Sequence, residues 1–170
     1  MLKKAILNFK AKRILKKRSQ ELMTDFKSSQ KIAIIYSDLF ENEKQIGEIV
    51  NELKKEGKEI SMMVYCHSIK KKTTALPHFH SKEISITGEI KSDDLNFFLR
   101  QSYDFALCFD QSRHFVIDYV FSQVKAKCRV GIRTPSRDHL FEMMIQADDQ
   151  QTPLSSEVLR YLKMIQSYEY

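Results

Sequence analysis

Four short apolar runs recur along the chain between polar segments, and they constrain the fold more than any other feature. They lie at residues 31–36, 59–66, 104–109 and 128–132. Continuous apolar runs of this length are typical of strands that are buried on both faces, as in a parallel sheet. Weaker patterns at residues 83–86 and 140–145 predict two further short strands, giving a sheet with mostly parallel strands.

Amphipathic segments separate these runs and predict helices. Apolar residues recur at helical spacing between the runs and again over residues 154–165. Ser37 or Asp38 is expected to cap one helix at its N-terminus and Ser92 or Asp93 another, and Gly57 stands where a left-handed C-cap is expected. Strands that alternate with helices predict an α/β fold, with helices flanking the sheet.

The beginning of the chain has a different charge from the remainder. Residues 1–18 contain eight basic and no acidic residues, whereas the remaining chain has 20 basic and 22 acidic residues. We expect residues 1–28 to form one long basic helix, or arm, followed by a single α/β domain over residues 29–170. The first half of this helix is polar on more than one side, so we expect little of it to be buried. The eight basic residues are Lys3, Lys4, Lys10, Lys12, Arg13, Lys16, Lys17 and Arg18.

A local block of positive charge predicts a polyanionic partner. Several Lys and Arg residues on one element displace counterions from a phosphate backbone, and Phe9 can stack on bases. RNA or a ribonucleoprotein is therefore the expected partner, with a protein contact also open. The alternatives are a merely solvated helix, a helix on an anionic membrane surface, or a homo-oligomer. In the oligomer, the helices would pair through Leu7, Ile14, Leu15 and Leu22.

A second candidate site lies at the carboxyl ends of the predicted strands, where open α/β sheets bind ligands. The residues expected at this edge are 37–38, 66–68, 110–114 and 133–137. An anion can bind there at a helix N-terminus with help from guanidinium groups. The residues of this alternative site are Asp110, Ser112, Arg113, Arg133 and Arg137.

Simpler roles compete with that anion site. Asp110 or Ser112 can cap the following helix, and the arginines can balance Asp138 and Glu142. Ser112 lacks the glycine-flanked turn of a hydrolase nucleophile. We therefore expect no catalytic residue.

The cysteines and histidines do not predict a metal site. Cys66, Cys108 and Cys128 lie in apolar runs, and their odd number argues against a disulfide framework, so we expect free, buried thiols. The pairs Cys66-His67 and His78-x-His80 lack the spacing of known zinc motifs, and we expect these histidines to lie at the surface or on an edge strand.

No cofactor is expected either. The four glycines are isolated, so the chain contains neither a P-loop nor a G-x-G-x-x-G motif. No apolar run reaches the length of a signal peptide core or a membrane span. Together with the free cysteines, this predicts a cytoplasmic protein.

One segment of the chain resembles two known families. It resembles a family of small uncharacterised proteins of Bacteroidetes-type bacteria through Tyr103-Asp104-Phe105-Ala106-Leu107, Asp110 and Ala126-Lys127-Cys128-Arg129-Val130-Gly131-Ile132. That resemblance covers most of the chain and implies a Rossmann-like domain, without an activity. The same segment is distantly similar to the acceptor half of heptosyltransferase-type glycosyltransferases over about 30 residues.

These observations lead to one expected function and one alternative. We expect a non-catalytic, cytoplasmic, ribosome-associated or otherwise RNA-binding protein that uses its basic N-terminal helix. The alternative is an enzyme-like glycosyltransferase half that binds a sugar or nucleotide phosphate at the strand edge.

Overall fold

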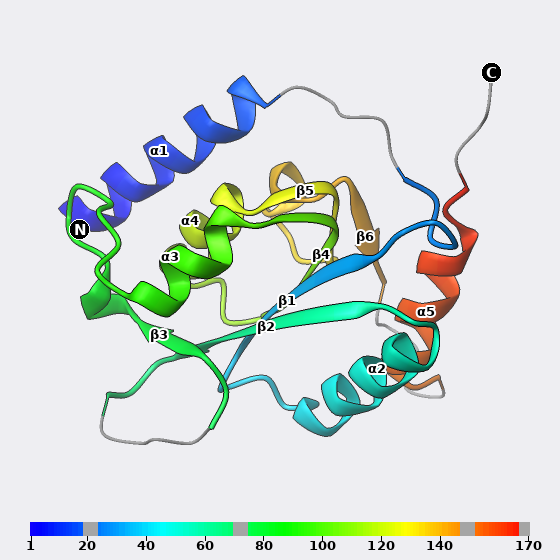
Figure 1. Cartoon of the computed structure of the whole chain (residues 1–170). Coiled ribbons are helices and arrows are strands. Elements are labelled where there is room, and N and C mark those ends of the chain that lie inside the picture. Colours follow the sequence, from blue (N-terminus) through cyan, green and yellow to red (C-terminus); the bar gives the residue numbers. More distant parts are fainter. Residues whose placement is uncertain (19–23, 70–74, 147–151, 167–170) are drawn as a thin grey trace.

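A six-stranded sheet with all neighbouring strands parallel forms the centre of the molecule, in the order β3-β2-β1-β4-β5-β6 (Figure 1). The structure is a computed structural model that describes residues 1–18, 24–69, 75–146 and 152–166. The strands are β1 (Lys31–Ser37), β2 (Glu59–Cys66), β3 (His78–His80), β4 (Ser102–Phe109), β5 (Lys125–Ile132) and β6 (Met143–Ile145). The helices are α1 (Leu2–Lys17), α2 (Glu43–Lys55), α3 (Asp93–Arg100), α4 (Phe115–Gln123) and α5 (Leu154–Met164), with 3-10 turns η1 (Ser81–Glu83) and η2 (Asp138–Leu140).

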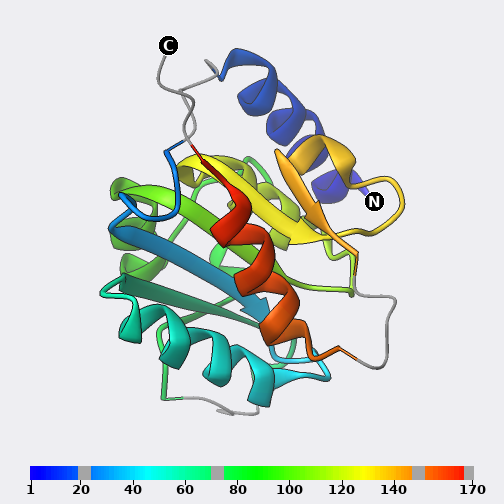
Figure 2. The ribbon, with the colours of Figure 1, turned by 90° about the vertical axis from the view of Figure 1, so that its right-hand side faces the viewer.

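Helices cover both faces of this sheet. Helices α2 and α5 lie on one face, and α3 and α4 lie on the other, with α1 stacked on α4 (Figure 2). Along β1, Ile32 and Ile34 enter the core beside α2 and α5, whereas Ala33 and Ile35 enter the core on the other face. Burial on both faces explains why the strands appear as continuous apolar runs. The predicted α/β, Rossmann-like fold is confirmed.

The strand order reverses at the centre of the sheet. From β1 the chain proceeds outward through β2 to β3, and then returns to β4 on the other side of β1 and proceeds to β6. The point between the carboxyl ends of β1 and β4 is therefore the topological switch point, where ligands bind in open α/β sheets.

Two of the predicted caps are confirmed. The Ser92 hydroxyl accepts a hydrogen bond from the backbone N–H of Leu95 at 3.3 Å, at the start of α3. Gly57 has a φ of 76° and ends α2, where the N–H of Lys58 donates to the carbonyl of Leu53 at 3.0 Å. This is the hydrogen bond of a Schellman motif, which requires the left-handed conformation that glycine adopts without strain.

The prediction that one helix spans residues 2–28 was wrong. Helix α1 ends at Lys17, and Arg18 has an extended conformation; residues 19–23, including Leu22, lie outside the described residues. Phe26 is buried on the opposite face of the sheet, with its ring centroid 6.4 Å from that of Phe105. The chain has to pass from the α4 side to the α2 side before β1, which a continuous helix does not allow.

Two strand predictions need correction. Residues 83–86 do not form a strand: the edge strand is β3, followed by η1, because the Glu83 carboxylate turns back to accept from the His80 N–H at 2.7 Å. Only Met143–Ile145 of the segment 140–145 is a strand, and Leu140 belongs to η2. Within the described residues, no helix is long and apolar enough to cross a membrane.

Candidate functional site

Helix α1 is packed against the rest of the fold. Leu7 is fully buried and Ala11 is 4% exposed, and both belong to the core that includes α4. The Lys3 ammonium donates to the carbonyl of Ser81 at 2.6 Å, and the Lys10 ammonium donates to the carbonyl of Thr87. As expected, little of this helix is buried: Leu7 and Ala11 are the buried residues of its 16. This narrow stripe of side chains is nevertheless enough to dock the helix.

The fold divides the eight basic residues into two groups. The Arg18 guanidinium pairs with the Glu142 carboxylate at 3.0 Å and also donates to the carbonyl of Ala126. Arg18, Lys3 and Lys10 are thus three of the eight cations that contact other groups of the same chain. The other five are exposed, and the structure gives them neither an ion pair nor a hydrogen bond within its described residues. These five, which we call the basic face, are Lys4, Lys12, Arg13, Lys16 and Lys17.

Two apolar side chains of α1 are exposed as well, one before the first of these cations and one among them. Phe9 is 67% exposed and Leu2 is 66% exposed. Lys16 and Lys17 lie in the last turn of α1, where the helix dipole favours positive charge. The basic face thus combines cations with an exposed aromatic ring, as single-stranded nucleic acid sites do.

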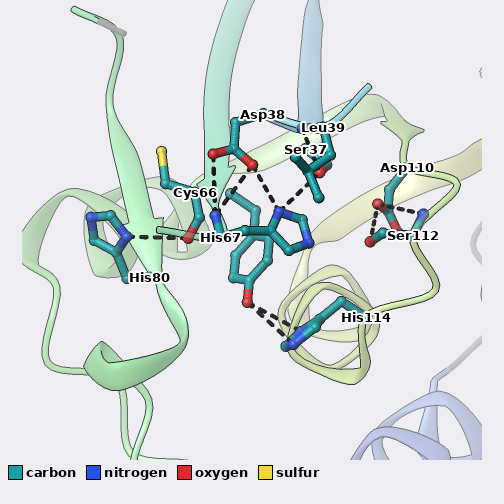
Figure 3. Close-up of polar contacts among 10 residues, drawn as sticks. Ser37, Asp38, Leu39, Cys66, His67, His80, Asp110, Ser112 and His114 are labelled. Carbon is teal, nitrogen blue, oxygen red and sulfur yellow. Dashed lines mark hydrogen bonds and ion pairs between the residues drawn. The ribbon is translucent and has the colours of Figure 1, made fainter. Parts of the chain in front are cut away.

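At the carboxyl ends of β1 and β2, polar side chains meet beside the switch point (Figure 3). The Nδ1–H of His67 donates to Oδ1 of Asp38 at 2.7 Å, and the His67 backbone N–H lies 3.2 Å from both Asp38 carboxylate oxygens. The prediction that Ser37 or Asp38 caps α2 was wrong: Asn42 occupies the N-cap position, and the Asp38 carboxylate fixes the loop after β2. Ser37 Oγ lies 3.4 Å from the same Nδ1 and accepts from the Leu39 N–H.

This Asp38–His67 pair has the arrangement of a general base. The carboxylate holds the ring with Nδ1 as donor, so Nε2 of the neutral ring can accept a proton. Ser37 Oγ, however, faces the nitrogen that is bonded to Asp38, and is not placed to give its proton to Nε2. The pair fixes a histidine at the sheet edge without supplying a nucleophile to it.

His114 lies next to this pair and caps α4. Its ring centroid is 5.6 Å from that of His67, and its Nδ1 accepts from the backbone N–H of Val116 at 3.4 Å. Burial lowers the pKa of His114, and the neighbouring His67, Lys3 and Lys4 lower it further. These effects, which Asp110 partly opposes, favour the neutral form of the His114 ring.

Asp110 and Ser112 have a different role from the predicted cap. The Asp110 carboxylate accepts from the Ser112 N–H at 3.0 Å and from the Ser112 hydroxyl at 2.6 Å, which forms a turn before the helix. Asp110 is 1% exposed, and its other oxygen lies 3.3 Å from the Arg137 guanidinium. The cap prediction was wrong because His114, two residues later, occupies the N-cap position.

The three arginines of the alternative site are in different environments. Arg137 is 3% exposed, and its guanidinium also contacts the Asp118 carboxylate at 2.6 Å, so its charge is matched within the chain. Arg133 is exposed and lies 3.5 Å from the side-chain oxygen of Gln146. Arg113 is exposed and has a φ of 55°. The site predicted at these residues is therefore only partly assembled, with Arg137 serving mainly to hold the loops.

The cysteines and the remaining histidines are placed as predicted. Cys66, Cys108 and Cys128 are free and buried, and burial raises the pKa of the Cys108 thiol to about 12. His78 and His80 lie on the edge strand β3. In the parts of the chain that the structure describes, no group of three or more His, Cys, Asp or Glu residues is arranged to hold a metal ion.

Asn8 and His139 were not among the site residues predicted from the sequence. Both line a cavity between α1 and the strand edge, together with Arg113. The spacing of Lys4, Asn8 and Lys12 shows that they share one side of a helix, but no sequence signal indicates what that side faces.

Comparison with known proteins gives a family without a described activity. A search of curated proteins finds no match to the chain. A family model matches residues 3–165, which include all of α1 except its first residue, all six strands and nearly all of the described chain. The chain belongs to DUF6913, a family of unknown function.

Proposed function

We propose that this protein binds RNA, alone or within a ribonucleoprotein such as the ribosome, through the basic face of α1. The observation that carries the proposal is that five cations on one docked helix lack partners within the described chain. The protein is proposed to be non-catalytic and cytoplasmic, in keeping with its three free cysteines.

The geometry of α1 suits a phosphate backbone. Lys4 and Lys17 are about 20 Å apart along the helix axis, at about 1.5 Å per residue, which is enough to reach several successive phosphates of a single strand. Phe9 lies between them and offers a ring on which a base can stack. Because the core holds the helix through Leu7, binding does not require the helix to form first, and less entropy is lost on binding.

The same packing disfavours the other proposed uses of this helix. A membrane-surface helix needs an apolar face that is free to enter the lipid, whereas Leu7 and Ala11 face the protein core. Pairing between two copies through Leu7, Ile14 and Leu15 is disfavoured for the same reason, because Ile14 and Leu15 pack against that core.

Salt dependence provides the test. We would measure the affinity for a single-stranded oligouridine of about 20 nucleotides by fluorescence anisotropy, between about 50 and 200 mM KCl. Five phosphate contacts on a single strand predict a slope of about −3.5 in log K against log salt. The double variant Lys16→Ala/Lys17→Ala should weaken binding and bring the slope to about −2.

A matched pair of lysines controls for general charge. Lys54 and Lys55 occupy the last turn of α2, as Lys16 and Lys17 occupy that of α1, and are exposed. The variant Lys54→Ala/Lys55→Ala should leave the slope unchanged. The proposal is wrong if the two double variants weaken RNA binding equally, or if the wild type does not bind.

A second candidate is a phosphorylated small ligand at the strand edge, as in a lone glycosyltransferase half. The Asp38–His67 pair supports it, because these polar side chains meet at the carboxyl ends of β1 and β2, the edge at which open α/β sheets bind ligands. Ligand-induced stabilisation by nucleotide sugars would test it, and the absence of any rise in melting temperature would contradict it.

A further inference from the structure

A cavity of about 330 Å³ lies between α1, the start of α4 and the β5–β6 connection. Helix α1 contributes Lys4, Asn8 and Lys12, which follow one another at intervals of four residues and therefore share one side of the helix. Arg113 and His139 line the cavity from the other elements. The cavity exists because Leu7 and Ala11 dock α1 beside these loops.

The charges around this cavity are unbalanced. Within the described chain, Lys4, Lys12 and Arg113 have no carboxylate at ion-pair distance. The carboxylate that lines the cavity, Asp118, is already engaged by Arg137 at 2.6 Å. Three cations held around one concave surface repel one another, and an anion between them would relieve that repulsion.

Arg137 also lines the cavity but does not contribute to this unbalanced charge. It is 3% exposed, and its guanidinium contacts the carboxylates of Asp110 and Asp118. The unpaired positive charge at the cavity therefore belongs to Lys4, Lys12 and Arg113.

The backbone around the cavity is also unusual. Arg113 has a φ of 55° and Ser136 has a φ of 68°; among the described non-glycine residues these are the two in the left-handed region, and both line the cavity. Non-glycine residues in this region are strained, and such strain is concentrated at ligand sites.

The size and lining of the cavity indicate the class of ligand. A volume of about 330 Å³ is at the lower end for small-molecule sites, which suits a phosphate group with a sugar or a nucleoside attached. A phosphate monoester carries close to two negative charges at neutral pH, and arginine and lysine are its usual partners. Phe115 adds an aromatic surface for the attached ring.

We propose that this cavity binds a phosphate monoester, either on a free sugar or nucleoside or at the 5′ end of an RNA strand. Lys4, Lys12 and Arg113 hold the phosphate oxygens. The site shares Lys4 and Lys12 with the basic face that is proposed above to bind RNA, whereas Arg113 belongs to this site alone.

Two probes distinguish the two sources of phosphate. Uridine 5′-monophosphate, compared with uridine by calorimetry, tests a free ligand. An oligouridine of about ten nucleotides with a 5′-phosphate, compared with the same strand with a 5′-hydroxyl, tests an RNA end. A preference for phosphate in either comparison supports the proposal and identifies the source.

Variants connect that preference to the cavity. Arg113→Asn removes the guanidinium and leaves a residue that tolerates a left-handed conformation. It should lower the affinity for the phosphate-bearing probe about tenfold. Lys12→Ala, at an exposed helical position, should also lower this affinity. Arg133→Ala removes an exposed cation that does not line the cavity and should change the affinity less than about twofold.

The outcomes are separable from those of the RNA proposal. Lys16→Ala/Lys17→Ala should lower oligouridine affinity without changing the preference for phosphate, because neither residue lines the cavity. The cavity proposal is overturned if neither probe shows a phosphate preference, or if Arg113→Asn and Arg133→Ala reduce that preference equally.

Discussion

Leu7→Ala tests whether α1 belongs to the folded core, on which both proposals depend. Leu7 is fully buried, and its Cδ2 lies 3.4 Å from the position that a Cβ on Gly88 would occupy. The turn around Gly88 is in turn fixed by the Tyr119 hydroxyl, which donates to the Gly88 carbonyl at 2.8 Å. Truncation at Leu7 therefore leaves a space between α1, this turn and α4.

The size of the effect follows from this burial. Removal of three buried carbon groups at about 0.8 kcal/mol each, with a further cost for the cavity, predicts a loss of about 3 kcal/mol in the free energy of unfolding. In a protein of this length, 1 kcal/mol corresponds to about 2–4 °C in melting temperature, so we expect a decrease of about 6–12 °C. Alanine is a better helix former than leucine, so a change in helix propensity does not explain such a loss.

Chemical and thermal unfolding, together with hydrogen exchange of the α1 amides, would measure this effect. Phe9→Ala is the matched control, since Phe9 is on the same helix and 67% exposed, and its effect should stay within about 0.5 kcal/mol. In Leu7→Ala, the α1 amides should lose protection before those of the sheet. Equal effects of the two substitutions, with unprotected α1 amides in the wild type, would show that α1 is an undocked arm and refute the reasoning.

Two further predictions concern titratable groups. Burial opposes ionisation of Asp104, but the N–H of Gln30 at 2.7 Å and the Lys127 ammonium at 2.9 Å hold its pKa below the ordinary 3.8. A carboxylate whose pKa is lowered by folding stabilises the native state at any pH above its ordinary pKa, and this stabilisation is lost as the pH falls through the lowered pKa. In urea unfolding, Asp104→Asn should therefore lower the free energy of unfolding by about 1.5 kcal/mol at pH 7, and by progressively less below about pH 4. For His114, the pKa is lowered by burial and then by His67, Lys3 and Lys4, against the opposing effect of Asp110, so the variant Lys3→Ala/Lys4→Ala should raise the pKa in an NMR titration.

Each of these predictions has a clear contrary result. A difference between wild type and Asp104→Asn that does not change with pH would mean that the carboxylate charge contributes nothing at this position. For His114, Lys16→Ala/Lys17→Ala is the control, because these lysines lie at the other end of α1. An equal rise in the His114 pKa in both double variants would indicate a general charge effect and not contact with the start of α1.

The sheet could be predicted from sequence because burial on both faces leaves a local pattern. The apolar runs of β1, β2, β4 and β5 are continuous, and the predicted bounds differ from the observed ones by only a few residues. The short strands were less accurate, because β3 and β6 pair over three residues each and depend on their neighbours more than on their own composition. Gly57 and Ser92 were also predictable, since each cap depends on contacts within a few residues.

The candidate sites were only partly predictable. Asp38, His67 and Asp110 were expected at the strand edge because each closely follows an apolar run, and they are found there. The partners of these residues were not predictable. Asp38 is hydrogen-bonded to His67, 29 residues away in the sequence, and Arg137 forms ion pairs with Asp118 and Asp110.

The sequence by itself determined the α/β alternation and the concentration of positive charge before residue 19, because both depend only on the order of residues. The tertiary structure decided where α1 lies and which of its cations remain free. Leu7 and Ala11 form a stripe too narrow to indicate burial, and their partners are more than 70 residues away on Gly88 and α4. Docking depends on shape complementarity between distant segments, which has no local sequence pattern.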